Sequence, residues 1–206
     1  MNHEKSTILV PAQIGTAFEG GFYGGIINSH GGAKKFAIVW APKALGEKKS
    51  IWLPSYTDVP NAASCFHSMD NTVAMAEAGS PLAKWALGLE INGHKDWCIP
   101  ARDVLELAYR NLKPGTDENF ASFRDGDNPS SIPAGYPYTE QSPIQTTADA
   151  FRDGGPEAFE RRWYWSSTQY PEHGAWAQNF DDGRQGNYFK SYEALARAVR
   201  LIQLSA

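Results

Sequence analysis

The late part of the chain gathers side chains that could recognise a ligand. Between residues 170 and 192, hydroxyl, amide, imidazole and charged groups alternate with aromatic rings. Aromatic rings stack on sugars or pack against receptor side chains, and polar groups on neighbouring loops set the orientation of the ligand. We therefore predict a binding surface made of Tyr170, Glu172, His173, Gln178, Asn179, Arg184, Gln185, Asn187, Tyr188 and Tyr192.

Residue patterns that would support catalysis or metal binding are not found. The five histidines lack His-x-His and His-Glu-x-x-His spacing, so no zinc site is predicted. The acidic run 125–128 lacks the EF-hand spacing and is interpreted as a solvated turn. Ser166 and Ser167 lie in a strand pattern without the Gly-x-Ser-x-Gly elbow of a serine nucleophile. We predict no catalytic residue, no metal and no cofactor.

The two cysteines, Cys65 and Cys98, are expected to be free buried thiols. A disulfide between them stays open at this stage, because sequence alone does not exclude the pair.

Two arginines near the end of the chain, Arg197 and Arg200, lie among apolar residues. They could recognise an anion, but an arginine in such surroundings is normally paired. We expect structural pairing with a carboxylate such as Asp96 or Glu106.

The predicted site must be carried by the segment 163–200, which reads as short antiparallel strands. Large rings recur at alternate positions, and such rings supply most of the burial in a small core. Trp163 and Trp165 share one face of a strand, and Trp176 and Phe180 share one face of the next. Asp182-Gly183 between these runs predicts a hairpin, because glycine adopts positive φ at little cost.

The front of the chain predicts further strands. Residues 1–19 are expected to form an arm or a first edge strand, and the glycine pairs of 20–27 indicate bulges or close backbone packing. The run 36–41 is apolar on both faces and predicts an interior strand. A polar loop is expected at 46–49 and a short strand at 51–53.

Helical signals follow in the middle of the chain. Asp70 or Asn71 could cap a helix over 72–78, and Ser80-Pro81 could cap one over 82–87. Whether these are one kinked helix or two stays open. A further helix is predicted from 104 to 112, ended by Pro114-Gly115, although Ala101 offers no capping hydroxyl.

From residue 116 to 143 the composition shifts to Pro, Gly, Ser, Asn and Asp, with isolated aromatic residues. A stretch of this length without regular structure is usually functional or an interaction arm. We interpret it as a long loop pinned by its aromatic residues, followed by short helical turns at 147–152 and 156–161.

Composition limits the class of protein. The 206 residues fit one domain, and 42% hydrophobic and 13% aromatic residues indicate a globular interior. The net charge of −4 gives no case for nucleic-acid binding. The apolar run 8–10 is too short for a signal peptide, and no span could cross a bilayer, so we expect no membrane insertion and no classical export.

Two motifs carry a family resemblance. The run 164–168 with Trp176, Phe180, Lys190 and Val199-Arg200, and the run 96–105, resemble the Lcl C-terminal-domain-like family of C-type-lectin-fold proteins. The resemblance covers about residues 20–202, and members occur in bacteria and bacteriophages. It implies an α+β, C-type-lectin-like domain over 20–206, with a twisted antiparallel sheet, two main helices and long loops. In some relatives the late strands are varied by a retroelement while the core positions stay fixed.

The resemblance implies a non-catalytic binding domain, as in a phage tail or tail-fibre protein that contacts a host-surface protein or glycan. The alternative is a structural virion protein that docks onto other virion proteins through the loop 116–143. In both cases we expect location in the virion and a homo-oligomer, since such proteins are commonly symmetric. An enzyme of the formylglycine-generating type is the least favoured interpretation, because neither cysteine lies in the C-terminal region where that chemistry would need it.

Overall fold

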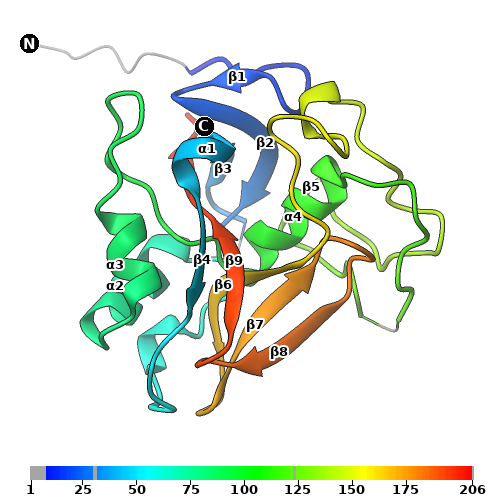
Figure 1. Ribbon diagram of the computed structural model, residues 1–206. Helices are drawn as coiled ribbons and strands as arrows, with labels where there is room; N and C mark the ends of the chain where they lie inside the picture. The colour runs from blue at the N-terminus through cyan, green and yellow to red at the C-terminus, as the bar shows by residue number, and fades with distance from the viewer. Residues whose placement is uncertain (1–7, 30–31, 123, 206) are drawn as a thin grey trace, which may run out of the picture.

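The computed structural model describes residues 8–29, 32–122 and 124–205. The chain is a mixed α+β structure with two five-stranded, mostly antiparallel sheets and few helices. Figure 1 shows the first sheet at one end of the molecule and the second fanning out towards the other. Residues 1–7 of the predicted N-terminal arm lie outside the described residues.

The first sheet is built from both ends of the chain. Its order is β1 (Ala17–Phe18), β2 (Gly21–Asn28), β3 (Lys35–Trp40) and β10 (Val199–Gln203), with β5 (Ser131–Ile132) paired to β2. The predicted interior strand is confirmed, since β3 lies between β2 and β10 and its Ala37 to Trp40 are fully buried. The predicted bulge is also confirmed, because the register of β2 shifts between Tyr23 and Gly25, where Gly25 has φ +119°.

The second sheet carries the predicted site. Its order is β4 (Glu47–Ile51), β9 (Glu193–Arg197), β6 (Trp163–Tyr170), β7 (Gly174–Asn179) and β8 (Gln185–Phe189). All pairings are antiparallel except the one between β6 and β9. Ala198 alone separates β9 from β10, so one extended segment joins the two sheets.

The predicted hairpin at Asp182-Gly183 is confirmed. It connects β7 to β8, Gly183 has φ +82°, and a side chain there would collide with the ring of Tyr109. The polar loop predicted at 46–49 is wrong. A short helix α1 (Lys43–Gly46) leads directly into β4, an outer strand of the second sheet whose two lysines are exposed.

Three longer helices cover the sheets: α2 (Ser68–Glu77), α3 (Pro81–Leu87) and α4 (Arg102–Leu112), with a 3-10 turn η1 (Pro60–Ala62) before them. The open question at Gly79 is therefore resolved as two helices. The cap predicted for α3 is confirmed, since Ser80 Oγ accepts a hydrogen bond from Ala83 N at 3.1 Å. The expected start of α2 at Asp70 or Asn71 is wrong, because the helix begins at Ser68.

Helix α4 begins at a residue without a capping side chain, and distant hydroxyls supply the acceptors instead. Ser68 Oγ accepts from Ala101 N at 2.8 Å, and Thr168 Oγ1 accepts from Arg102 N at 2.9 Å. These bonds tie the start of α4 to both α2 and β6, so the missing local cap is replaced by tertiary contacts.

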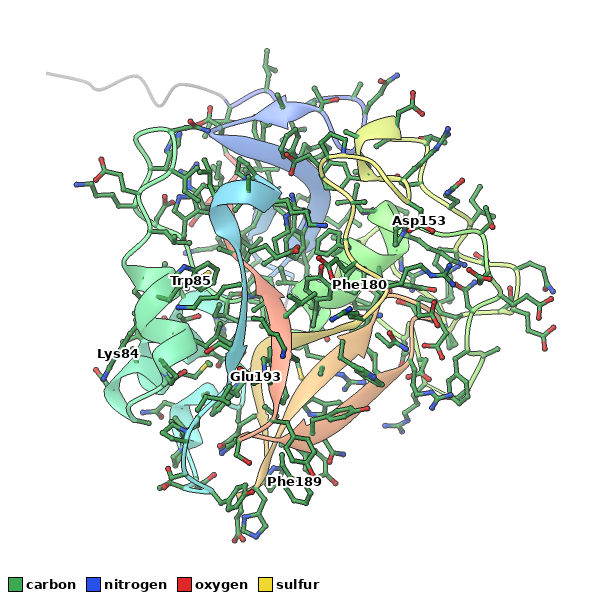
Figure 2. The ribbon with its side chains drawn as sticks, in the orientation of Figure 1. Lys84, Trp85, Asp153, Phe180, Phe189 and Glu193 are labelled. Carbon is green, nitrogen blue, oxygen red and sulfur yellow. The ribbon has the colours of Figure 1, made fainter. Side chains whose placement is uncertain are left out.

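The ring-rich core predicted for the late strands is confirmed. Trp165 and Phe180 are fully buried, and Phe180 stacks on Phe159 with ring centroids 4.4 Å apart. Figure 2 labels Phe180 in the interior of the molecule. Trp176 is half-buried, with the guanidinium of Arg102 4.1 Å from its ring centroid.

The long loop 116–143 is tied to α4 rather than extended as an arm. Tyr138 is buried and its hydroxyl donates to Glu106 at 2.8 Å, while Asn119 receives the Tyr109 hydroxyl at 2.7 Å. Of the short turns expected after the loop, one is the 3-10 turn η2 (Asp149–Phe151) and the other is irregular. No helix within the described residues is long and apolar enough to cross a membrane.

Candidate functional site

A cleft of about 370 Å³ opens at the tip of the second sheet, where β6 turns into β7 and β8 ends. Its walls are mainly aromatic, and it contains neither a carboxylate nor an ammonium group. The lining residues are Tyr170, Pro171, His173, Gly174, Asn187, Tyr188, Phe189 and Tyr192.

Several rings around this cleft are unusually exposed. Tyr56, Phe189 and Tyr192 are 51%, 50% and 52% exposed, and Tyr170 is 42% exposed. Phe189 lies between the other two rings of the first group, with centroids 5.9 Å from Tyr56 and 5.4 Å from Tyr192. Figure 2 shows Phe189 at the outer end of the molecule. Clustered exposed rings of this kind mark interaction sites more often than isolated ones do.

Lys190, the residue after β8, holds the tip together from inside. Its side chain is fully buried, its Nζ donates to Thr57 O at 2.8 Å and Gln169 Oε1 at 2.9 Å, and it lies over the Trp52 ring. Burial lowers the pKa of this ammonium group. These bonds fix the loop that carries Tyr56 against the end of β8, so the exposed rings stand on a rigid support.

Two further clefts continue from the tip along the second sheet. One of about 480 Å³ shares Tyr188 and Tyr192 with the tip cleft and reaches Trp163. The next, of about 370 Å³, shares Trp163 and contains Asn179. The Trp163 and Tyr188 ring centroids are 4.6 Å apart. The three clefts therefore adjoin one another through shared residues and form one groove, whose rings lie mainly in the two clefts nearer the tip and whose far cleft is lined mostly by charged side chains.

The structure brings part of the predicted surface together. Five of the predicted residues line the tip cleft: Tyr170, His173, Asn187, Tyr188 and Tyr192. Glu172 lies in the adjoining turn with φ +57°, its carboxylate 3.8 Å from the His173 ring nitrogen. Asn179 lines the far end of the groove.

The other predicted residues lie elsewhere. Gln178 is corrected, because it is 1% exposed and its amide donates to the Tyr138 hydroxyl at 3.1 Å and to Gly183 O at 3.2 Å. Arg184 and Gln185 lie at the opposite end of the β7–β8 hairpin, where Gln185 accepts from Arg102 at 2.9 Å. A surface that includes all ten residues is therefore not formed within one chain.

Sequence reasoning missed Tyr56 and Phe189, and assigned Trp163 to the core alone. Phe189 follows two predicted site residues, and its position at the end of a short polar strand was a usable signal. Tyr56 lies far away in sequence and reaches the tip through the Lys190 contacts, which no local pattern indicates.

The two late arginines are structural, as predicted. Arg200 Nε lies 2.5 Å from Asp96 Oδ1, which confirms one of the two named partners. Arg197 is fully buried and pairs with Glu157, whereas Glu106 pairs with Arg110 at 2.9 Å.

The remaining chemistry-bearing groups do not converge. Cys65 and Cys98 are free. Cys98 is buried as expected, and burial raises the pKa of its thiol. Cys65 is exposed contrary to expectation, and partial desolvation of its sulfur raises the pKa of that thiol. Among the described residues there is no group of three or more His, Cys, Asp or Glu side chains able to hold a metal ion. What the tip cleft offers is stacking area and a few neutral hydrogen-bonding groups. Comparison adds no relative: no protein-family model and no curated protein matches this chain.

Proposed function

We propose that this chain is a non-catalytic, lectin-like binding domain that recognises a host-surface receptor or glycan. In this proposal it belongs to a phage tail or tail fibre and functions in the virion. The observation that carries the proposal is the cluster of rings around the tip cleft, each 42% to 52% exposed and held by a buried lysine. Leaving four such rings in water is costly unless a ligand covers them.

The chemistry of the tip favours a neutral ligand. Ring faces stack on the apolar faces of sugars or on receptor side chains, while the Asn187 amide and the tyrosine hydroxyls offer hydrogen bonds. The charged groups of the groove lie further along, where Lys49 pairs with Glu193 at 2.7 Å.

The proposal includes a C-type-lectin-like fold. Antiparallel curled sheets, helices packed on them and a long loop between α4 and β6 agree with what the resemblance of the sequence leads us to expect. Because one fold hosts many functions, the binding role rests on the cleft and not on the fold.

The test is a comparison of variants on a printed glycan array and on intact bacterial cells. Tyr192→Ala and Phe189→Ala each remove a half-exposed ring, and stacking losses of ~1–3 kcal/mol would weaken binding roughly 5- to 150-fold. Tyr136→Ala is the matched control, since this ring is 78% exposed but lies on the long loop. Equal binding by all three variants would count against the tip cleft.

A second candidate function is docking onto a tail or capsid scaffold through the long loop. It is favoured by Tyr136 on the loop and by Ile144 directly after it, which are 78% and 73% exposed. Deleting the loop would not test this, because its Tyr138 and Asn128 hold the buried Glu106. Tyr136→Glu with Ile144→Glu is the sharper test: particles lacking the protein would support docking, and normal particles would argue against it.

A further inference from the structure

The outer edge of β8 leaves a specific set of backbone groups without partners. Asn179 N donates to Arg184 O at 2.9 Å and Lys190 N donates to His173 O at 3.0 Å. These bonds fix the alternation of the β7–β8 ladder, so the amide and carbonyl groups of Gln185, Asn187 and Phe189 point away from β7. Figure 1 shows β8 as the border of the second sheet.

Two of these outward groups are already satisfied. Gln185 N donates to Asp125 Oδ1 at 3.1 Å, and Phe189 O accepts from Tyr192 N at 2.9 Å. Within the described chain, four groups remain unpaired: the carbonyl of Gln185, both groups of Asn187 and the amide of Phe189. They alternate as acceptor, donor, acceptor and donor along the edge.

This order is self-complementary about Asn187. In an antiparallel pair of β8 strands centred on Asn187, the two Asn187 residues exchange both of their hydrogen bonds. Each Gln185 carbonyl then faces a Phe189 amide. Gln185 N and Phe189 O also face each other in this register, so Asp125 and Tyr192 must release them for the two strands to pair at these ends.

Most other strand edges of the described chain are charged, short or bridged by another segment, whereas β8 is covered only at its two ends, by Asp125 and Tyr192. The outer strand β4 carries Lys48 and Lys49, β1 and β5 have two residues each, and Cys98 bridges β10 at Val199. Strand β8 reads Gln-Gly-Asn-Tyr-Phe, without charge, proline or bulge. Unprotected edges invite pairing with another strand, and a neutral strand does not repel its own copy.

We propose that the chain forms a twofold symmetric dimer through β8, with Asn187 at the twofold axis. The second copy is favoured over a foreign strand because twofold pairing about Asn187 places each unpaired donor of one β8 opposite an unpaired acceptor of the other. The register brings Gln185 of the second copy opposite Phe189, so the two ends of the predicted binding surface, separated within one chain, meet across the interface. This dimer does not depend on the identity of the ligand.

The test uses sedimentation velocity of the full chain from about 5 to 500 µM, a range suited to small interfaces. We expect the wild-type protein to shift from monomer to dimer across this range. Asn187→Pro removes an amide that points away from β7, so it should abolish the dimer while the hairpin persists. Asn187→Ala keeps the backbone and should still dimerise.

A crosslinking measurement keeps the test decisive if the proline variant does not fold. In a Cys65→Ser background, Asn187→Cys should form an intermolecular disulfide on mild oxidation. Directly opposite residues lie ~5.5 Å apart, within disulfide reach. Gly186→Cys is the control: its added Cβ meets only the Trp163 ring at 3.5 Å, but its twofold mate is not opposite. A monomeric wild-type protein at every concentration, an unaltered dimer of Asn187→Pro, or equal crosslinking at 186 and 187 would overturn the proposal.

Discussion

Tyr138→Phe tests whether the long loop belongs to the folded core. The Tyr138 hydroxyl donates to Glu106 Oε1 at 2.8 Å and accepts from Gln178 Nε2 at 3.1 Å, and the side chain is 4% exposed. The substitution keeps the ring that packs 5.5 Å from Tyr109 and deletes only the oxygen. It therefore isolates the polar attachment of the loop to α4 and β7.

The expected loss of unfolding free energy follows from the two hydrogen bonds that the Tyr138 hydroxyl makes. A hydrogen bond to a charged group contributes ~1.5–3 kcal/mol, and Gln178 loses one of its two acceptors. Glu106 keeps Arg110 and Asn128, at 2.9 Å and 2.6 Å, so the carboxylate is not left without partners. We expect unfolding at pH 7 to become easier by ~2–3 kcal/mol, or ~4–12 °C in midpoint.

Urea unfolding followed by tryptophan fluorescence measures this change. With an unchanged slope, the midpoint should fall by about 1 M. The matched control is Tyr136→Phe, whose hydroxyl is exposed on the same loop and should change stability by less than ~0.5 kcal/mol. The Tyr138→Phe penalty should also shrink at about pH 4, where a protonated Glu106 needs the donor less. A Tyr138→Phe variant as stable as the control would mean that the loop is an arm.

Three further outcomes are expected. Iodoacetamide should modify Cys65 in the native protein and leave Cys98 intact until unfolding, because Cys98 is 2% exposed; peptide mass spectrometry that finds native Cys98 labelled would contradict its burial. Burial raises the pKa of Glu106 above its ordinary 4.5, so the stability it contributes is complete below that value and is lost as pH rises through the raised pKa. The Glu106→Gln penalty in urea unfolding should therefore shrink from pH 4 to 7, and a penalty that grows would show Arg110 outweighing burial. Ser80→Ala removes both the cap of α3 and a donor to Trp52 O, and should cost ~1–3 kcal/mol in the same assay; no change would contradict the cap.

Elements with local signals were predictable from sequence. Ser80-Pro81 specifies the start of α3 through its own hydroxyl and a fixed proline φ, and Gly183 specifies the hairpin because glycine takes its φ of +82° at little cost. Strand β4 was missed because its charged residues read as a loop, whereas pairing with β9 makes it a strand. The first turn of α4 was also missed, because the acceptors for its backbone amides come from Ser68 and Thr168, which are distant in sequence.

The site shows where strand periodicity was applied incompletely. Gln178 has the same parity as Trp176 and Phe180, which were themselves predicted to face inward, so its burial followed from the alternation already recognised. The contribution of Tyr56 could not be found this way. It reaches the tip because a buried lysine bonds to Thr57 O and because its own hydroxyl bonds to Ser191 Oγ, contacts between residues 133 and 135 positions apart.

Different side chains of the same strands contribute to stability and to the predicted binding surface, and Tyr188 contributes to both. Asn187 and Phe189 are exposed and belong to no buried cluster, so replacing their side chains should alter binding with little effect on folding. Tyr188 lines the cleft, yet its ring packs 4.6 Å from Trp163 and against the cluster that holds Trp165. A tip that varies freely at 187 and 189 must therefore keep a large ring at 188. That single constraint follows from the sheet geometry and not from the ligand.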